Sequence, residues 1–183
     1  MIKGFLYILL ATLLFNSVET KAQRNLIVNG GFEDGLTSWG YGNAKISGFI
    51  RNSGENSLAL VSFAKGKWEG ADQKVKLPKN AKAILVTGFG KTDGVEPGDN
   101  SWNTAVVILE FINGEQKVGE GTVLMQKIGT EDWMPFKKAM KIPEHATGFR
   151  VIIALSEASG TFFVDDLSAK IIPQEDLDND KPH

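Results

Sequence analysis

The sequence FRVIIALSEASGTFFVDDLSAKI, residues 149–171, contains two segments rich in apolar and aromatic residues, joined by SEASG. In the first segment every second residue is apolar, namely Phe149, Val151, Ile153 and Leu155. This period of two predicts a strand with one face packed into a core. Arg150 and Ala154 lie on the opposite face, which is expected to be a solvated or a binding surface. The second segment, 161–171, is predicted to be another strand.

The rest of the chain repeats this pattern. Stretches rich in Val, Ile, Phe and Thr recur between Gly, Asn, Asp and Pro residues, which is typical of strands joined by turns. Asn113-Gly114 indicates a hairpin, and no segment carries a sustained helical stripe of apolar residues. The predicted fold class is therefore all-β, a two-sheet antiparallel β-sandwich of the jelly-roll kind. The predicted strands lie near residues 25–28, 45–50, 57–63, 71–77, 83–91, 104–112, 116–124, 133–142, 149–155 and 161–171.

The composition argues against several classes of function. Of 183 residues, 20 are Lys or Arg and 22 are Asp or Glu, a formal net charge of −2. Nucleic-acid binding needs clustered cations, and the sequence has no basic block. The lack of Cys excludes a disulfide framework, a thiol nucleophile and Cys-ligated zinc. Because there are only two His residues, a Ser-His-Asp triad or a multi-His metal site is not expected.

Residues 1–22 are predicted to be a signal peptide. Lys3 precedes an apolar run over residues 4–15, and small residues follow at a cleavage site. The run is short for a membrane span of roughly 20 residues, although a membrane anchor is the alternative. We therefore expect a protein that is secreted, periplasmic or at the cell surface, with no membrane insertion after signal cleavage. Residues 23–172 would form one domain, and 173–183 an acidic disordered tail.

Three stretches together match a known family pattern: 25–39 (NLIVNGGFEDGLTSW), 52–61 (NSGENSLALV) and 132–171. They resemble the opening strand and turn, the second motif and the last three strands of carbohydrate-binding modules of the family-four and family-nine type. These modules are galactose-binding-like jelly rolls, and their last strand ends in an aromatic-x-Asp-Asp-aliphatic signature. The stretches occur in the family's order and span nearly all of the predicted domain. The resemblance implies the sandwich fold and non-catalytic glycan binding.

The resemblance also implies a structural calcium ion. In such modules a Glu of the first motif and an Asp of the last strand meet at one edge of the sandwich, and here these are Glu33 and Asp165. Further oxygen ligands are expected from the Gly31 carbonyl and from the loop between Asn52 and Glu55, because Ca²⁺ takes about six to eight oxygens. The alternation of the last strand points Asp165 toward the edge of the core, where an unpaired carboxylate would be costly. The alternative is that Glu33 and Asp165 only accept hydrogen bonds from backbone and turn groups.

Six residues are candidates for contact with a glycan. Sugar rings present apolar C–H faces and hydroxyl rims, so a site needs an aromatic platform with polar side chains around it. Trp68 lies in a segment similar to one where several of these modules place a sugar-stacking Trp, and Trp102 follows a polar loop at the expected groove rim. Alternation points Phe89 and Arg150 outward, and we expect them on one shared sheet face. The complete candidate set is Trp68, Trp102, Phe89, Arg150, Gln73 and Glu110.

Other functions compete with glycan binding. The stretch GFGKT (88–92) lacks the upstream Gly and the following helix that a phosphate loop needs, so nucleotide binding is rejected. Glycoside hydrolysis needs two carboxylates, but no pair is singled out here, and a glycoside-active enzyme is a remote alternative. A secreted adhesion or protein-interaction sandwich without sugar binding is the main alternative. The leading hypothesis is a module that binds a polysaccharide or oligosaccharide, with a glycan-processing protein as a further partner to be tested.

Overall fold

The computed structural model describes residues 24–177, which contain eleven strands and one short 3-10 helix. Residues 1–23 and 178–183, and with them the predicted signal peptide and the end of the predicted tail, lie outside the described residues. In the described range no helix is long and apolar enough to cross a membrane. The elements are β1 (Gly40–Tyr41), β2 (Lys45–Ser47), β3 (Ser57–Ser62), β4 (Trp68–Lys76), β5 (Ala83–Glu96), β6 (Ala105–Asn113), β7 (Gln116–Lys117), β8 (Thr122–Lys127), β9 (Gly129–Lys141), β10 (Gly148–Ser156), β11 (Ser159–Ile172) and η1 (Gln174–Leu177).

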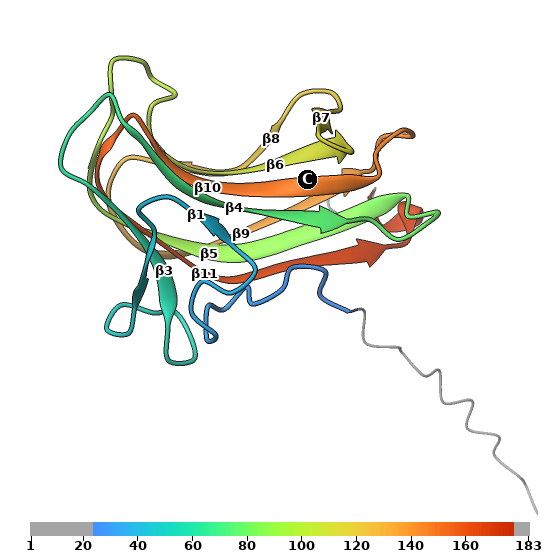
Figure 1. The fold of residues 1–183 in the computed structure, drawn as a ribbon, viewed down its shortest axis with the longest axis horizontal. Coiled ribbons are helices and arrows are strands. Elements are labelled where there is room, and N and C mark those ends of the chain that lie inside the picture. Colours follow the sequence, from blue (N-terminus) through green and yellow to red (C-terminus); the bar gives the residue numbers. More distant parts are fainter. Residues whose placement is uncertain (1–23, 178–183) are drawn as a thin grey trace, which may run out of the picture.

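The strands form two stacked antiparallel sheets. The six-stranded sheet has the order β1-β4-β10-β6-β7, with β8 paired to β6, and the five-stranded sheet has the order β2-β3-β11-β5-β9. Figure 1 shows β4, β10 and β6 curving together, so that the outer face of the six-stranded sheet is concave. The prediction of an all-β, two-sheet antiparallel sandwich is confirmed.

The core lies between the two sheets. The four apolar residues of β10 that were predicted to share one face are each 0% exposed. Phe162 and Val164 of β11, with Ile84 and Val86 of β5, join them in the core cluster. Truncating one such large side chain to Ala costs about 2–5 kcal/mol of stability. This packing energy fixes which face of each strand is turned toward the core. The residues between them are thereby fixed on the outer faces of the sandwich.

The predicted strand at 25–28 is wrong: the backbone bond of 2.8 Å from the Leu26 N–H to the Ala169 carbonyl is not continued as a ladder, and side-chain amides make the neighbouring bonds. The Asn25 side chain accepts from the Ile27 and Ala169 backbone N–H groups and donates to the Leu167 carbonyl. Further along, Val28 exchanges two hydrogen bonds of 2.9 Å with the side chain of a residue on β4. The segment is held against the sandwich edge without joining a sheet.

The predicted strand at 116–124 is divided into β7 and β8. Gly119 between them adopts φ +72°, a left-handed conformation that Gly takes without strain. The predicted hairpin is present, and the register pairs Asn113 with Gln116, so that Gly114 and Glu115 form the turn. This turn stands at one end of the concave face.

A β-bulge interrupts β11 at Asp165 and Asp166. The register with β5 shifts between Asp165 and Ser168, and Asp166 adopts φ +53°. Val164 before the bulge and Leu167 after it both face the core, because the extra residue resets the alternation. Asp165 is 0% exposed, and it is buried beneath loop residues rather than by the strand alternation from which its burial was predicted.

Candidate functional site

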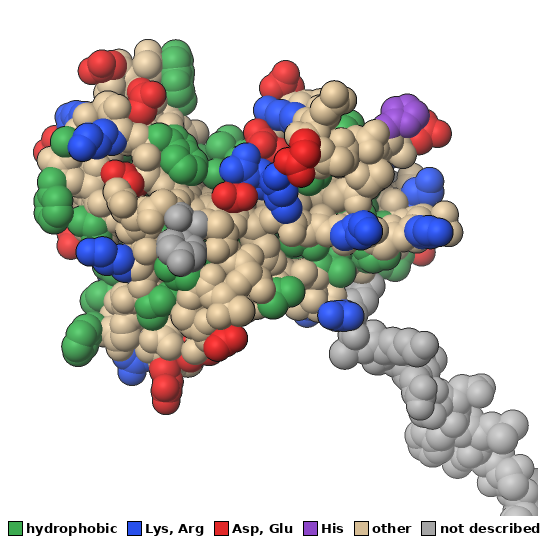
Figure 2. Space-filling model, in the orientation of Figure 1, with side chains coloured by type: hydrophobic (Ala, Val, Ile, Leu, Met, Phe, Trp, Pro, Cys, Tyr) green, Lys and Arg blue, Asp and Glu red, His purple; other side chains and the backbone are tan. Residues whose placement is uncertain are grey.

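The floor of the concave face is largely apolar. Residues of β4, β10 and β6 that face outward stand in lateral rows, and two of these rows are Gly70–Ala154–Val106 and Asp72–Ile152–Ile108. Ala154 and Val106 are buried although they face away from the core, so neighbouring side chains must shield them from solvent. Figure 2 shows the upper outline of the molecule hollowed between two raised lobes in this region. The face is therefore a groove with an apolar strip along its floor.

Trp68 covers part of this floor. A Cβ atom added to Gly70 would lie 2.3 Å from Trp68 Cη2 and 2.7 Å from Cζ2. The indole ring is therefore seated over Gly70, and it fits only because that residue has no side chain. The Trp68 residue is still 52% exposed, which leaves apolar ring surface open to a ligand.

Trp102 lies at the same end of the groove. Ser156, the register partner of Trp68, donates its backbone N–H to the Thr104 carbonyl at 2.9 Å. Trp102 precedes Thr104 by two residues in the β5–β6 loop and is 65% exposed. Two exposed Trp side chains thus flank one end of the six-stranded sheet.

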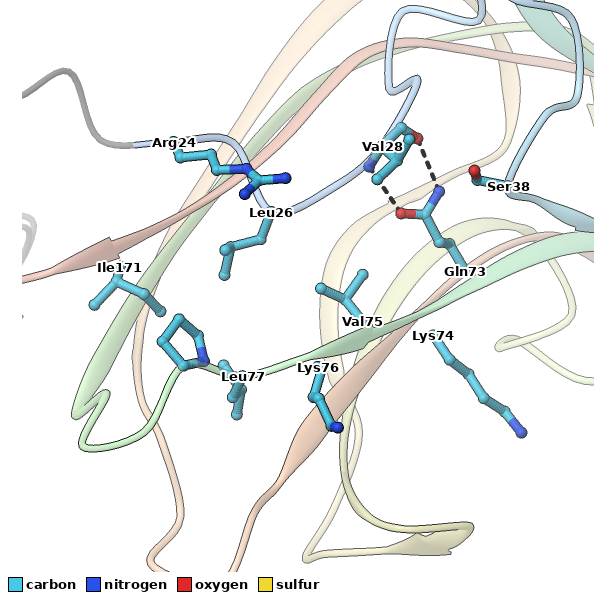
Figure 3. Close-up of a pocket in the computed structure, with 11 residues that line it drawn as sticks. Arg24, Leu26, Val28, Ser38, Gln73, Lys74, Val75, Lys76, Leu77 and Ile171 are labelled. Atoms are coloured by element: carbon cyan, nitrogen blue, oxygen red, sulfur yellow. Dashed lines mark hydrogen bonds between the residues drawn. The ribbon is translucent and has the colours of Figure 1, made fainter.

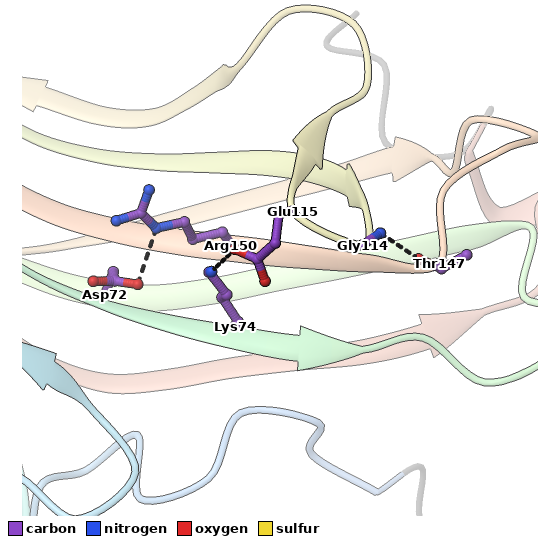
Figure 4. Close-up of polar contacts among 6 residues, drawn as sticks. All are labelled: Asp72, Lys74, Gly114, Glu115, Thr147 and Arg150. Atoms are coloured by element: carbon purple, nitrogen blue, oxygen red, sulfur yellow. Dashed lines mark hydrogen bonds and ion pairs between the residues drawn. The ribbon is translucent and has the colours of Figure 1, made fainter.

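The other end of the groove is ionic. Arg150 Nε donates to Asp72 Oδ2 at 2.9 Å, and Lys74 pairs with Glu115 across β10 (Figure 4). The bond to Asp72 is the main cause that raises the pKa of Arg150 above its ordinary value, so this side chain stays a cation. Its terminal nitrogens point away from Asp72 and out of the sheet (Figure 4).

Two further contacts order this ionic end. Lys117 Nζ lies 3.2 Å from Glu110 Oε1, which ties the β7 strand to β6. The turn that carries Glu115 is held by a bond of 3.1 Å from the Gly114 N–H to Thr147 Oγ1 (Figure 4). Figure 2 shows basic and acidic side chains gathered along the hollow. The groove therefore offers aromatic surface at one end and fixed hydrogen-bonding groups at the other, a combination suited to a ligand with both apolar faces and hydroxyls.

The structure brings some of the predicted site residues together and separates others. Trp68, Arg150 and Glu110 share the concave face, with Trp102 at its rim. The expectation that Phe89 shares a face with Arg150 is wrong, because β5 belongs to the five-stranded sheet. Phe89 therefore lies on the far side of the sandwich.

Gln73 also lies away from the groove. It is 5% exposed and faces the interior in step with Ala71 and Val75, where its amide bonds the Val28 backbone. Sequence reasoning did not place Gly70 or Asp72 in a binding groove. The alternation that places Trp68 outward could have found them, since Trp68, Gly70, Asp72 and Lys74 are two residues apart.

A second cluster of polar groups surrounds the 52–56 loop. Asp165 Oδ2 accepts the backbone N–H groups of Asn52 and Ser53, at 2.9 and 3.2 Å. Glu33 accepts those of Glu55 and Asn56, at 3.0 and 3.2 Å. The residues from which calcium ligands were predicted therefore do meet at one edge of the sandwich. Their carboxylates hold this loop through its N–H groups.

The negative charge of this cluster favours the binding of a cation. The number of side-chain oxygens available as ligands is too small to enclose one. Burial is the largest cause that raises the pKa of Asp165, and no cationic side chain is among the groups that oppose it. A metal ion would supply the missing positive charge. Gly31 lies beside this carboxylate, since a Cβ added there would be in ordinary contact with Asp165 Oδ1, at 3.9 Å. Over residues 24–177, however, no three His, Cys, Asp or Glu side chains are placed to enclose a metal, so carbonyl oxygens would have to complete the shell.

A cavity of about 720 Å³ opens at the sandwich edge, separate from the groove. It lies between the 24–28 segment and the inward side of β4, and Leu26, Val75 and Leu77 form much of its apolar wall (Figure 3). The paired hydrogen bonds between Gln73 and Val28 stand at one side of it (Figure 3). Because it lacks an exposed aromatic ring, it matches the predicted ligand chemistry less well than the groove.

Comparisons with known proteins relate the chain to solved β-sandwich structures. A family 16 carbohydrate-binding module is 24% identical over 79% of this chain and 99% of its own, with a TM-score of 0.59. A xylan-binding domain of module family 22 is 17% identical over 80% and 95%, with a TM-score of 0.55. The enzymatically active domain of bacteriophage CBA120 tailspike protein 4 is 12% identical over 81% of this chain, with a TM-score of 0.68, and this chain spans 21% of its length.

No protein-family model matches the sequence, and no curated protein matches it. The similar structures establish the fold, in which two antiparallel sheets stack as they do in carbohydrate-binding modules. The narrower resemblance to families four and nine is not confirmed, since the modules found here belong to families 16 and 22. This chain therefore has the β-sandwich fold seen in carbohydrate-binding modules.

Proposed function

We propose that this protein is a non-catalytic glycan-binding module whose ligand lies in the groove of the six-stranded sheet. The observation that carries the proposal is the pair of exposed Trp side chains, Trp68 and Trp102, at one end of an apolar floor. The similar structures support it, because they include modules whose names state that they bind carbohydrate or xylan. An adhesion or protein-interaction sandwich is the alternative that the test must separate.

In this proposal the two ends of the groove have different tasks. Trp68 stacks on the C–H face of a sugar ring, which hides apolar surface of both partners from water. Arg150 donates its terminal N–H groups to sugar hydroxyls, and Asp72 and Glu110 accept from others. Because these charged groups are already ion-paired, they enter the complex pre-organised.

The proposal includes no catalysis. Carboxylates that hydrolyse a glycoside flank the scissile bond together. In this groove Asp72 and Glu110 are instead bound to different cations, Arg150 and Lys117. Release of new reducing ends from a bound glycan by the purified protein would contradict this part of the proposal.

The decisive experiment compares binding to insoluble and soluble polysaccharides for the wild type and Trp68→Ala. We expect the wild type to bind one glycan class and the variant to lose about tenfold or more in affinity, since a central aromatic anchor is removed. Phe89→Ala is the matched control, because this ring lies on the opposite sheet, and it should bind normally. If the wild type bound no glycan class but did bind a protein partner, the adhesion alternative would be favoured.

We further propose that a calcium ion binds beside Asp165, with Glu33, Asn52, Glu55 and the Gly31 carbonyl around it. A cation there offsets the desolvation of the buried Asp165 carboxylate. The prediction is that chelation lowers the melting temperature of the wild type, because an ion bound only to the folded state stabilises it. The Asp165→Asn variant should not respond to chelation. An unchanged wild-type melting temperature after chelation would remove calcium from the proposal.

Secretion remains part of the proposal on the strength of residues 1–22 alone, which carry the signal-peptide pattern. A protein at or beyond the cell surface would meet polysaccharide directly, and a glycan-processing protein would be a natural neighbour. Mass spectrometry of the exported protein tests this point. The expected N-terminus is residue 23, and retention of residues 1–22 in a membrane fraction would instead indicate an anchor.

A further inference from the structure

A second cavity, of about 470 Å³, lies at the open edge of the sandwich. It is formed where the β1–β2 connection, the end of β3 and the start of β4 meet, and its lining residues are Asn43, Lys45, Val61, Ser62, Phe63, Ala64, Lys67 and Glu69. We call it the edge cavity. Trp68 between Lys67 and Glu69 points to the concave face, so the edge cavity and the groove are separate surfaces.

Phe63 stands at the mouth of the edge cavity with its ring in solvent. It is 97% exposed, and Val61 beside it is 37% exposed. Val61 projects outward from β3, because Leu60 and Ser62 take buried positions of that strand, and Phe63 is the first residue after it. A fully solvated aromatic ring contributes nothing to the core, so Phe63 is available as a platform for a ligand.

The cations of the edge cavity have no acidic partner. In residues 24–177, Lys45 and Lys67 form no ion pair, whereas nearby Lys65 pairs with Glu96 at 3.2 Å. The one carboxylate in the lining, Glu69, accepts a hydrogen bond of 2.7 Å from Asn43 Nδ2. The cavity thus holds an excess of one positive charge beside a fixed amide–carboxylate pair, which is a set of donors and acceptors suited to hydroxyls.

We propose that the edge cavity binds a uronic acid residue of a glycan. The C–H face of the pyranose ring packs on Phe63 and Val61, and the sugar carboxylate pairs with Lys45 and Lys67. Ring hydroxyls bond the Asn43–Glu69 pair. A neutral sugar would leave both exposed lysines bonded only to water, and a simple carboxylate would leave the aromatic platform unused, so a carboxylated ring uses all three features.

The test is titration of the purified protein with glucuronic acid, galacturonic acid, glucose and acetate, followed by amide chemical shifts. We expect both uronic acids to shift the signals of the edge-cavity residues, with binding that weakens as salt rises. Glucose and acetate should produce shifts at least several-fold weaker at the same concentrations. The Trp68→Ala variant should bind the uronic acids normally, so failure of the groove and failure of the edge cavity are told apart.

Variants locate the site within the edge cavity. Phe63→Ala and the double variant Lys45→Ala, Lys67→Ala should each reduce uronic acid affinity by about tenfold, and the double variant should also lose the salt dependence. Lys170→Ala, which removes an exposed lysine on β11 away from the cavity, is the matched control and should bind normally. No shift at the edge cavity, equal shifts with glucose or acetate, or unchanged binding by the double variant would each overturn the proposal.

Discussion

The groove and the edge cavity both combine an exposed aromatic ring with lysines, yet they are built differently. In the groove Trp68 rests on Gly70, and Lys74 and Lys117 are each paired with a carboxylate. In the edge cavity Phe63 is 97% exposed, and the two lining lysines, Lys45 and Lys67, have no ion-pair partner within residues 24–177. The charged groups of the groove are therefore paired with each other before a ligand binds. The lysines of the edge cavity would gain an anionic partner only from the ligand.

This difference shows that regular strand pairing fixes the positions of the side chains on a surface. The groove is carried by three adjacent strands in continuous register, so each outward residue has fixed lateral neighbours. The edge cavity combines strand ends with the connections beside them: Phe63 and Lys67 lie between β3 and β4, where no ladder fixes the spacing of side chains. Ligand binding at the groove should cost less ordering of side chains than binding at the edge cavity.

The largest effect on the groove alone should follow from Gly70→Ala. The added Cβ would lie 2.3 Å from the Trp68 ring and 2.8 Å from the Ile153 carbonyl oxygen, so the indole must swing away from the floor. We expect glycan affinity to fall by about fivefold or more, approaching the loss in Trp68→Ala. The measurement is titration together with the indole N–H signal of Trp68. A groove that binds normally with a displaced indole would mean that the seated ring is not the platform.

A smaller effect is expected from Arg150→Ala. This change removes the donor aimed into the groove and leaves Asp72 without its cation. A charged hydrogen bond contributes about 1.5–3 kcal/mol, but this one is partly exposed to solvent, so we expect a loss of about two- to fivefold in glycan affinity. Arg150→Lys is the matched control, and it should recover part of the affinity. Equal binding by wild type and Arg150→Ala would move the contacts toward the Trp end.

The smallest effect on binding should come from Gln73→Leu, although this residue was a predicted ligand contact. The variant leaves the Val28 backbone N–H and carbonyl without their partners. Loss of a half-buried polar pair of this kind costs about 1–3 kcal/mol, so thermal unfolding should begin several degrees earlier. Glycan titration of the folded variant should match the wild type. A selective loss of glycan affinity would instead place the ligand near the edge between Val28 and β4.

The sequence predicted the sandwich and most strand positions because alternation reports directly on burial. The fully buried face of β10 and the outward position of Trp68 both follow from a period of two. Alternation does not report which sheet a strand joins, and for that reason Phe89 and Arg150 were wrongly expected on one face. Sheet membership depends on contacts between distant segments, such as the pairing of β5 with β11.

The period-two alternation of apolar residues also failed to predict two local features of the structure. The Asn25 side chain bonds the β11 backbone on both sides of a single backbone bond from Leu26, so this apolar segment forms no strand. The bulge at Asp165 and Asp166 inserts one residue into β11, and the alternation counted from either end then disagrees there. Alternation alone could not name the loop partners of Asp165, because Asn52 and Ser53 are more than a hundred positions away; the family resemblance was what placed this loop beside it.

The regular register of the strands also fixes the distance between the two ends of the groove, so the groove can respond to the length of its ligand. Ser156, beside Trp68, and Arg150 are six residues apart on β10, and at about 3.3 Å per strand residue this separation is roughly 20 Å. A single sugar is far shorter than this span and touches one end at a time. A glycan chain long enough to reach both ends gains the second set of contacts without losing further translational freedom. Affinity in the groove should therefore rise with chain length until the ligand fills the distance between the aromatic and ionic ends, and then stay level.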